Sequence, residues 1–345
     1  VIEMTIDVEK KEIRAVALTP IVQQTAFWAE VKSYQGIESK AFDFKVKNSE
    51  VYVDDLTKTS TYADLLILQQ ALNKDTSIAY VPYGPELEPS EEVQGEFLEE
   101  LSEILRSYLP KSCIGIRYDL AWQSHWDKPE NYNESNTWEG PPDRKYQEIR
   151  LNYNTNNWNL KRANSDILPA HTVYLDLIPD EQTLLARMKP KTRYNIHLAA
   201  RKGVTVRRAG MEELPLWYKL YSDTAQRNGI FLNDIEYFKS VLAAKADDTL
   251  SPATVELLLA EKDGEALAAI FLVLSGNRGT YLYGASSSNH RNCMPTYALQ
   301  WEAIRIAKAS GCTEYDMFGV SPGPEPSHPM YGLYKFKMGF GGQLF

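Results

Sequence analysis

The stretch from Tyr281 to Ile304 reads Tyr-Leu-Tyr-Gly-Ala-Ser-Ser-Ser-Asn-His-Arg-Asn-Cys-Met-Pro-Thr-Tyr-Ala-Leu-Gln-Trp-Glu-Ala-Ile. It opens within an apolar run that starts at Gly279 and is typical of a strand. From residue 295 onward its apolar residues recur at helical spacing, and Gly311 ends that helix. The free backbone N–H groups at the beginning of a helix favour anions and polar ligands. We therefore expect a strand that leads, through a polar loop, into a helix whose first turn suits such a ligand.

The predicted elements around this stretch follow a recognisable order. We expect a strand at 171–177, a helix at 180–200, a strand at 204–207, helices at 212–227 and 234–246, strands at 255–261, 266–275 and 279–283, a helix at 295–310 and a strand at 314–318. From residue 204 onward, this order is that of the acetyltransferase-type (GNAT) fold.

The first half has a similar but less regular order. It predicts a strand at 10–18, a helix at 24–33, a hairpin over 40–53, apolar runs at 65–68 and 78–83, a helix at 97–108, a strand at 114–118 and a long loop at 121–165. We therefore predict the α/β (α+β) class, with two tandem GNAT-like acyltransferase domains whose mixed sheets are flanked by helices. The first domain covers residues 1–177 and is completed by 338–345, and the second covers 178–337.

The loop before the helix at 295–310 lacks the glycines that hold coenzyme A. In acetyltransferases this loop reads Arg/Gln-x-x-Gly-x-Gly/Ala, and its amides bind the pyrophosphate of the cofactor. Here it reads Arg291-Asn292-Cys293-Met294-Pro295-Thr296, so that Met294 and Thr296 fill both glycine positions. Side chains there block the close approach of a pyrophosphate to the backbone. The fold thus points to acyl transfer, whereas the motif that binds coenzyme A is incomplete.

Composition is that of an ordinary folded protein with room for two domains. The chain has 345 residues, of which 43% are hydrophobic and 24% charged. No apolar run approaches the roughly 20 residues that span a bilayer, so we expect no integral membrane segment. The first residues match neither a signal nor a transit peptide, although a start without Met leads us to expect natural termini outside this sequence. Three widely spaced cysteines suit a reducing compartment, and we predict a cytoplasmic protein; the five scattered histidines predict no metal site.

The net charge of −9 disfavours a nucleic-acid partner unless basic side chains are segregated. One segment meets that condition, because residues 187–208 hold eight basic residues and no acidic one. A solvated helix face would have the same composition. The basic residues are Arg187, Lys189, Lys191, Arg193, Arg201, Lys202, Arg207 and Arg208.

Four stretches in order resemble the FemABX aminoacyltransferase family. One is residues 281–304, quoted above. The others are Lys-Thr-Arg-Tyr-Asn-Ile-His-Leu-Ala-Ala-Arg-Lys-Gly-Val at 191–204, Tyr-Lys-Phe-Lys-x-Gly-Phe-Gly-Gly at 334–342, and Gln24-x-x-x-Trp28-Ala29-x-x-Lys32. The resemblance covers nearly the whole chain, and the loop at 121–165 is its weakest part.

This resemblance implies two GNAT-like domains and a transfer that needs neither coenzyme A nor metal. An amino acid moves from aminoacyl-tRNA to the side-chain amine of residue 3 of the peptidoglycan stem peptide. The first domain would bind the acceptor, and the second would hold the aminoacyl-tRNA end and the catalytic residues. Residues 223–248 are too short for the helical arm of the staphylococcal members, so the chain resembles the armless FemX type. The acceptor is then UDP-MurNAc-pentapeptide or its lipid-linked form.

The resemblance also assigns three acceptor-binding residues. Lys32 and Arg227 match basic residues that contact the acceptor diphosphate, which they would bind through charge-assisted hydrogen bonds. The alternatives are an exposed lysine and a cation that stabilises the C-terminus of a helix. Tyr283 would place a hydroxyl in the central channel, or else it is an aromatic residue of the core.

Three residues match the family's catalytic positions. Lys337 would stabilise the negative charge that develops on the ester carbonyl and on the departing ribose oxygen. Phe336 would stack on the terminal adenine of the tRNA; the alternatives are a surface lysine and a buried aromatic. Asp119 would orient the acceptor amine or take its proton, or it is a structural partner of Arg117.

For the tRNA acceptor stem, we predict contacts with Lys189, Lys191, Arg193, Arg201 and Lys202. Support of the domain boundary is the alternative role of this segment. Two other classes of function stay open, namely an acyl-CoA-dependent N-acyltransferase and a non-catalytic binding protein of the cell-wall machinery.

Overall fold

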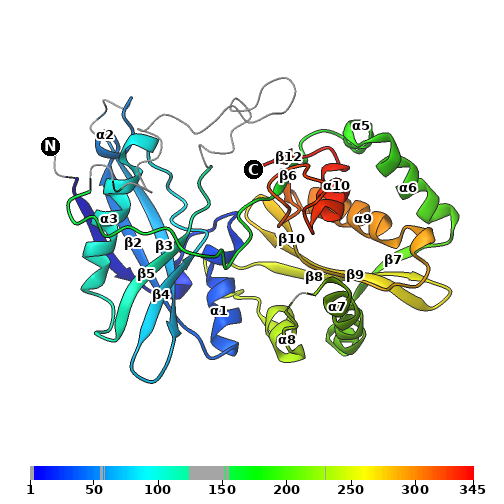
Figure 1. The fold of residues 1–345 in the computed structure, drawn as a ribbon, viewed down its shortest axis with the longest axis horizontal. Helices are drawn as coiled ribbons and strands as arrows, with labels where there is room; N and C mark the ends of the chain where they lie inside the picture. The colour runs from blue at the N-terminus through cyan, green and yellow to red at the C-terminus, as the bar shows by residue number, and fades with distance from the viewer. Residues whose placement is uncertain (1–3, 55–56, 58, 124–151, 153–154, 230) are drawn as a thin grey trace. The chain divides into compact units, whose positions relative to one another are not determined.

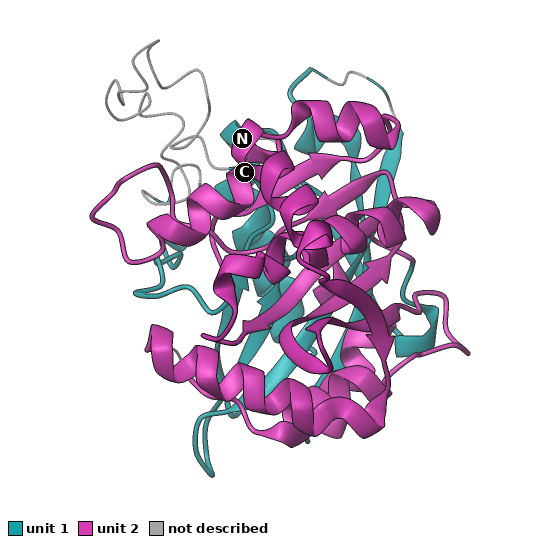
Figure 2. Cartoon of the chain, turned by 90° about the vertical axis from the view of Figure 1, so that its right-hand side faces the viewer, with its two compact units in different colours: residues 1–17, 36–168 teal, residues 18–35, 169–345 magenta. Residues whose placement is uncertain are grey.

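The chain folds into two compact units. The computed structural model describes residues 4–54, 57, 59–123, 152, 155–229 and 231–345. The first unit comprises Val1–Ala17 and Gly36–Leu168, and the second comprises Leu18–Gln35 and Pro169–Phe345 (Figure 2). The α/β class with two sheet-and-helix units is confirmed.

The first unit is a five-stranded sheet in the order β1-β2-β3-β4-β5. The first three pairings are antiparallel, whereas β4 and β5 are parallel and are connected through α3. Alternating apolar residues place Phe44, Leu65 and Ile67 in a core that Phe97 of α3 completes. The elements are β1 (Ile6–Lys11), β2 (Glu38–Lys47), α2 (Asn48–Val51), β3 (Ser60–Ala71), β4 (Ser77–Pro82), α3 (Gln94–Arg106) and β5 (Cys113–Asp119).

The second unit is built on a seven-stranded sheet in the order β12-β6-β11-β10-β9-β8-β7. From β7 to β11, its elements follow the predicted order. They are α1 (Ala26–Tyr34), β6 (Val173–Asp176), α5 (Glu181–Arg187), α6 (Pro190–Arg201), β7 (Thr205–Ala209), α7 (Leu214–Asn228), α8 (Ile235–Ala243), β8 (Thr254–Lys262), β9 (Glu265–Ser275), β10 (Arg278–Ser286), α9 (Pro295–Ala309), β11 (Glu314–Asp316), α10 (Tyr331–Met338) and β12 (Gln343–Leu344). Short 3-10 turns lie at Ile13–Ala15, Val22–Gln24, Glu91–Val93, Met211–Glu213 and Arg291–Cys293.

Helices cover both faces of this second sheet. Helices α5, α6, α9 and α10 lie on one face, and α7 and α8 lie on the other (Figure 1). Helix α9 packs closely on β10 because Gly279 has no side chain; an added Cβ would lie 2.7 Å from the Cβ of Ala307. The faces matter for the site because the residues discussed below divide between them.

A bulge in β10 sends its two signature tyrosines to opposite faces. Tyr281 pairs with Leu272 of β9, and Tyr283 pairs with Phe271, so the register shifts between them. Tyr281 packs with the core cluster that includes residues of α9, whereas Tyr283 contacts Phe238 of α8. Without the bulge, residues two apart in a strand would share a face.

The observed division of the chain differs from the predicted one. The units separate between Leu168 and Pro169 rather than near Leu177, and α1 belongs to the second unit. Residues 338–345 do not complete the first domain, because β12 pairs with β6 in the second sheet. None of the described helices combines the length and the apolar character that crossing a membrane requires.

Several element boundaries also differ from the predictions. The first strand is Ile6–Lys11 rather than 10–18. The helix predicted at 180–200 is two helices, since Pro190 begins a new helix after an extended Lys189. The hairpin predicted over 40–53 fails because α2 follows β2 directly and β3 begins at Ser60. Most of the loop predicted at 121–165 lies outside the described residues.

Candidate functional site

Lys337 is buried in the second unit, with only 4% of its surface exposed. Its Nζ donates hydrogen bonds to the carbonyl oxygens of Phe318, at 3.0 Å, and Gly319, at 2.9 Å. Phe318 has the positive φ of 58° that non-glycine residues rarely adopt. Lys337 is therefore held by a specific backbone turn and is not a surface lysine.

This lysine lies where two neighbouring strands of the sheet stop pairing. Strands β10 and β11 run parallel, and they pair only from Arg278 with Glu314 to Thr280 with Asp316. Beyond that point, the Nζ of Lys337 lies 4.9 Å from the ring centroid of Tyr281 on β10 and contacts the turn that follows β11. One cationic side chain thus connects the two strands at the place where they diverge.

Burial changes the ionisation of this group. Desolvation lowers the pKa of Lys337 to about 7, although the nearby charge of Asp316 opposes the shift. Asp316 is itself buried at the end of β11, which raises its pKa, whereas hydrogen bonds from Thr172 Oγ1 and the backbone N–H of Phe318 oppose that rise. Near neutral pH, both the ammonium and the free amine form of Lys337 are therefore populated.

Phe336 neighbours Lys337 in α10 and packs within the second core. Its ring meets Tyr297 of α9 edge to face at 5.0 Å between centroids, and Phe340 at 5.3 Å. The side chain is half-buried. It fits the alternative of a packing aromatic, and the stacking of an adenine on it stays a prediction.

Lys32 lies in α1 with its ammonium enclosed by aromatic rings. Its Nζ is 4.8 Å from the ring centroid of Trp28 and 5.2 Å from that of Tyr237 on α8. It also donates a hydrogen bond to Gln35 Oε1 at 2.8 Å. Desolvation lowers the pKa of Lys32 to about 8. Lys32 is a partly buried, structured cation rather than one more exposed lysine.

Tyr283 reaches the same group of residues from β10. Its hydroxyl lies 2.6 Å from the hydroxyl of Tyr237, and its ring meets Phe238 and Phe271 edge to face. Burial raises the pKa of Tyr283 well above its usual range. Tyr237 thus contacts both Lys32 and Tyr283, two of the residues predicted to bind the acceptor substrate. Apart from its place in a predicted helix, no feature of the sequence identified Tyr237.

Arg227 lies at the end of α7 and is exposed. Its guanidinium donates to the carbonyl oxygen of Ser286 at 3.0 Å and to the hydroxyls of Ser288, Ser286 and Thr224 at 3.2, 3.2 and 3.3 Å. These contacts hold it against the end of β10, the strand that carries Tyr283.

Asp119 belongs to the first unit, unlike the other predicted site residues. Its Oδ2 accepts hydrogen bonds from Tyr80 Oη at 2.8 Å and from the backbone N–H groups of Ile167 and Leu168 at 3.2 and 2.9 Å. Arg117 lies 3.5 Å from its Oδ1. These contacts are those expected if Asp119 has a structural role beside Arg117, and its catalytic role stays a prediction.

The basic segment divides into buried and free side chains. Arg193 Nη1 donates to the carbonyl oxygens of Leu185, Ala186 and Met188, so this side chain caps the C-terminus of α5. Its Nη1 donors are therefore directed at the protein backbone rather than outward. Three further arginines have acidic partners: Arg187 pairs with Asp176, Arg207 with Glu213 and Glu261, and Arg208 with Glu256.

Four cations of this segment are exposed and form no salt bridge within the described residues: Lys189, Lys191, Arg201 and Lys202. The guanidinium of Arg201 lies 5.6 Å from the ring of Tyr194, which is 56% exposed. Cations beside an exposed aromatic ring are suited to phosphates and bases. Tyr194 was absent from the residues predicted for this surface.

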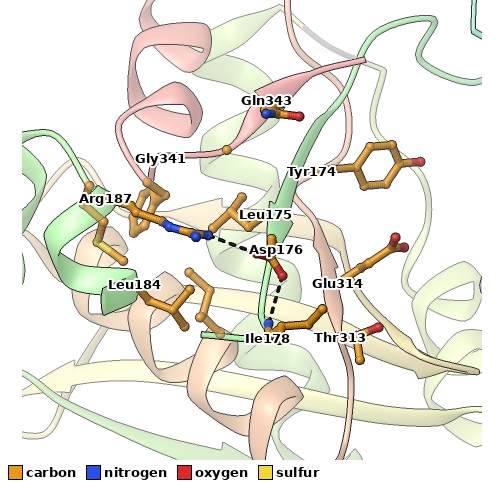
Figure 3. A pocket seen from close by; sticks show the side chains of 14 residues that line it. Tyr174, Leu175, Asp176, Ile178, Leu184, Arg187, Thr313, Glu314, Gly341 and Gln343 are labelled. Carbon is orange, nitrogen blue, oxygen red and sulfur yellow. Dashed lines mark hydrogen bonds and ion pairs between the residues drawn. The ribbon is translucent and has the colours of Figure 1, made fainter. Parts of the chain in front are cut away.

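A pocket of about 550 Å³ opens elsewhere in the second unit (Figure 3). Its lining includes Asp176, Arg187, Glu314 and Gly341. The carboxylate of Asp176 accepts from Arg187 at 3.0 Å and from the backbone N–H of Ile178 at 3.0 Å. The predicted site residues are absent from this lining, so the pocket is not the candidate site.

The loop before α9 keeps an unusual backbone although its glycines are replaced. Met294 is the N-cap of α9 and has a φ of 55°, in the left-handed region that favours glycine. Its side chain packs against the core of the second unit. A position whose backbone favours glycine thus carries a side chain that packs inward.

The chain is similar to known proteins in sequence and in fold. A model of the FemAB family matches residues 19–251 and 249–345. The lipid II:glycine glycyltransferase of Staphylococcus epidermidis is 26% identical in an alignment of length 235, and the match covers 52% of this chain and 56% of that protein. The protein of the same name from Staphylococcus aureus is 24% identical in an alignment of length 240, and the match covers 52% of this chain and 57% of that protein. The chain therefore spans about half the length of the curated relatives it matches.

A solved structure shares the fold over almost the whole chain. The crystal structure of FemX aligns with a TM-score of 0.68 and 18% sequence identity, covering 97% of this chain and 94% of that one. At this identity the likeness is one of fold.

Proposed function

Because the chain belongs to the FemAB family, we propose that it is an aminoacyltransferase of peptidoglycan synthesis. The donor is aminoacyl-tRNA, and the acceptor is the side-chain amine of residue 3 of the stem peptide. The observation that carries this proposal is Lys337, a buried cation held where β10 and β11 diverge. Its hydrogen bonds to the turn after β11 make it a rigid group in the fold.

The reaction needs no cofactor, because the ester of aminoacyl-tRNA already stores the free energy. The acceptor amine attacks the ester carbonyl, a C–N bond forms, and the C–O bond to the ribose breaks. The amine loses a proton, and the ribose oxygen gains one. Negative charge develops first on the carbonyl oxygen and then on the ribose oxygen. The ammonium form of Lys337 would stabilise both, an effect typically worth about 3 kcal/mol.

The acceptor diphosphate would be bound by Lys32, Arg227 and Tyr283. Two cations and a hydroxyl match the charge and the hydrogen-bonding capacity of a diphosphate. Lys32 and Tyr283 lie against one residue, Tyr237, and Arg227 is held at the end of the strand that carries Tyr283. This arrangement supports the binding of one anionic ligand by all three side chains.

The carrier of the acceptor has two candidates. Helices α7 and α8 are joined by residues 229–234, which is too short for a helical arm and favours the soluble UDP-linked muropeptide of the armless type. The names of the curated relatives point instead to lipid II. The experiment below therefore includes both carriers.

The tRNA acceptor stem would lie along the exposed part of α6. Lys189, Lys191, Arg201 and Lys202 would contact phosphates, and Tyr194 offers a ring to the RNA. Arg193 supports this surface from inside by capping α5. The concentration of free cations here offsets the acidic net charge of the chain.

The test is transfer of radiolabelled amino acid from a mixed aminoacyl-tRNA pool. UDP-MurNAc-pentapeptide and its lipid-linked form are offered separately, and Lys337→Met serves as control. We expect transfer to at least one acceptor and its loss in the variant. Transfer to neither acceptor, together with measurable binding of coenzyme A, would overturn the proposal in favour of an acyl-CoA-dependent enzyme.

A further inference from the structure

Tyr237 occupies a central place between residues that come from separate elements. Its ring lies under the Lys32 ammonium from α1, at 5.2 Å, and its hydroxyl meets that of Tyr283 from β10, at 2.6 Å. The ring also packs edge to face on Phe238, its neighbour in α8, at 5.4 Å. One side chain therefore contacts a cation through its face and a hydroxyl through its edge.

A chain of hydrogen bonds connects the same residues by a second route. Lys32 Nζ donates to Gln35 Oε1 at 2.8 Å, and Gln35 Nε2 donates to Ser240 Oγ at 2.9 Å. Ser240 in turn donates to the carbonyl oxygen of Tyr237 at 2.6 Å. The contacts therefore form a closed ring from Lys32 through Gln35 and Ser240 to Tyr237 and back to Lys32. Such a ring restricts all of its members to one arrangement.

These contacts restrict the position of the Lys32 ammonium. The lysine stem is flexible, and its ammonium is a compact charge that binds water strongly. A ring face on one side and an amide oxygen on the other replace part of that water. The ammonium is thereby fixed, although no carboxylate forms a salt bridge with it within the described residues. A cation without an acidic partner stays available to an anionic ligand.

We propose that Tyr237 is a positioning residue for acceptor binding, which orients the Lys32 ammonium through its ring and the Tyr283 hydroxyl through its own. Gln35 assists by fixing the distance between Lys32 and α8. The ligand is a diphosphate ester, the part of the acceptor that the soluble and lipid-linked forms share. This inference rests on the proposed function, since it assigns Lys32 and Tyr283 to that ligand.

The experiment measures steady-state transfer by the full chain and binding of UDP-MurNAc-pentapeptide by calorimetry. The lipid-linked acceptor in detergent micelles is the second substrate. Tyr237→Phe removes only the hydroxyl and keeps the ring over Lys32, whereas Gln35→Leu removes only the acceptor of the Lys32 hydrogen bond. Tyr221→Phe is the matched control: Tyr221 lies in the same aromatic cluster and donates to the carbonyl oxygen of Phe231.

We expect Tyr237→Phe and Gln35→Leu each to raise the acceptor KM about tenfold. In the first variant the Tyr283 hydroxyl loses its hydrogen-bond partner, and in the second the Lys32 ammonium loses its partner. The tRNA KM and the Tyr221→Phe variant should stay within about twofold of the wild-type values. The rise in acceptor KM should also depend on Tyr283 in the case of Tyr237→Phe and on Lys32 in the case of Gln35→Leu. Tyr237→Phe should add less than about twofold in a Tyr283→Phe background, and Gln35→Leu should add equally little in a Lys32→Met background.

Other outcomes would overturn the inference in distinguishable ways. An unchanged acceptor KM in Tyr237→Phe, with large effects of Lys32→Met and Tyr283→Phe, would reject Tyr237 and leave the proposed function intact. Equal losses in Tyr237→Phe and Tyr221→Phe would identify a merely structural role. If Lys32→Met and Tyr283→Phe themselves had no effect on the acceptor, the assignment of the acceptor site would fail, and this inference would fail with it.

Discussion

The Nζ of Lys337 lies 4.9 Å from the ring centroid of Tyr281, and this contact connects α10 to β10 beside the end of the paired part of the sheet. The ring offers the ammonium an electrostatic partner without a formal charge. Burial still lowers the pKa of Lys337 to about 7, because ring and carbonyl contacts replace water only in part. The ionisation of this single group therefore changes within the range in which enzymes are assayed.

This ionisation predicts the pH dependence of transfer. The acceptor amine, with an ordinary pKa of about 10.4, must lose its proton to attack, so the rate rises about tenfold per pH unit. If Lys337 acts as a cation, its loss of charge cancels this rise above about pH 7. We expect the logarithm of kcat/KM for the acceptor to rise up to that pH and then to level off. Besides the carbonyl oxygens of Phe318 and Gly319, Lys337 Nζ contacts the ring of Tyr281 on β10, and the charge of Asp316 on β11 acts on it.

The variant Lys337→Met provides the control for this profile. Its rate should be lower by about two to three orders of magnitude and should keep rising with pH without a break near 7. A wild-type rate that rises about a hundredfold per pH unit below pH 7, and continues to rise about tenfold per unit above it, would contradict the cationic role. That result would indicate instead that the free amine of Lys337 accepts the proton.

Lys32 predicts a separate pH effect, on binding rather than on the rate. Burial lowers its pKa to about 8, and only the ammonium form attracts a diphosphate. The affinity for UDP-MurNAc-pentapeptide should therefore be constant below pH 8 and should fall by up to about tenfold per unit above it. Calorimetry between pH 6.5 and 9.5, in buffers of equal ionic strength, would measure this. Lys32→Met should bind weakly and show no such fall, whereas a parallel fall in this variant would exclude Lys32 as the cause.

Arg193 and Lys191 form a matched pair in α6 with different predicted roles. Arg193→Ala removes donors to three carbonyl oxygens at the end of α5 and should lower the free energy of unfolding by about 1–2 kcal/mol. Lys191→Ala should change it by less than about 0.5 kcal/mol, because that side chain is exposed. Denaturant titration of both variants would measure this difference.

The same pair should behave in the opposite way toward RNA. Lys191→Ala should reduce the slope of log affinity for aminoacyl-tRNA against log salt by about 1, as expected for one lost phosphate contact. Arg193→Ala should leave the slope unchanged while it remains folded. An unchanged slope in Lys191→Ala would place the RNA on another surface.

The sequence predicted the fold well where one face of an element is buried. The helical spacing of α9 is a direct consequence of such burial, and β8 and β9 contain continuous apolar runs that are buried on both faces; all three elements lie where they were expected. Contacts between distant residues were not predictable in this way. The helical spacing continues through Pro190 and therefore predicted one helix. A proline is also favoured in the first turn of a helix, and here it begins a second one. Strand β12, which pairs with β6, has only two residues and is therefore too short to produce a recognisable sequence pattern.

For the site, the family resemblance identified residues but not their surroundings. Lys337 and Lys32 each gain a lowered pKa from burial, which is set by elements far away in the sequence. Arg193 has the correct helical spacing for an exposed stripe, yet carbonyl oxygens of the preceding helix attract its side chain inward. Tyr237 carries no motif, and only the positions of α1, α8 and β10 show its role.

Asp119 allows a structural and a catalytic role to be separated by two substitutions. Its Oδ2 accepts the hydrogen bonds from Tyr80, Ile167 and Leu168, so Asp119→Ala should leave these donors unpaired and lower the free energy of unfolding by about 1–3 kcal/mol. In Asp119→Asn, the amide oxygen can take the place of Oδ2 and keep all three bonds. We therefore expect Asp119→Asn to lose less stability than Asp119→Ala and, if the role is structural, to retain transfer; the remaining loss arises because the amide Nδ2 replaces the Oδ1 that accepts from Arg117 at 3.5 Å. Stability and transfer are measured on the same preparations. An Asp119→Asn variant that is fully stable but inactive would contradict this prediction, since only a proton acceptor or an ionic contact with the acceptor amine requires the carboxylate itself.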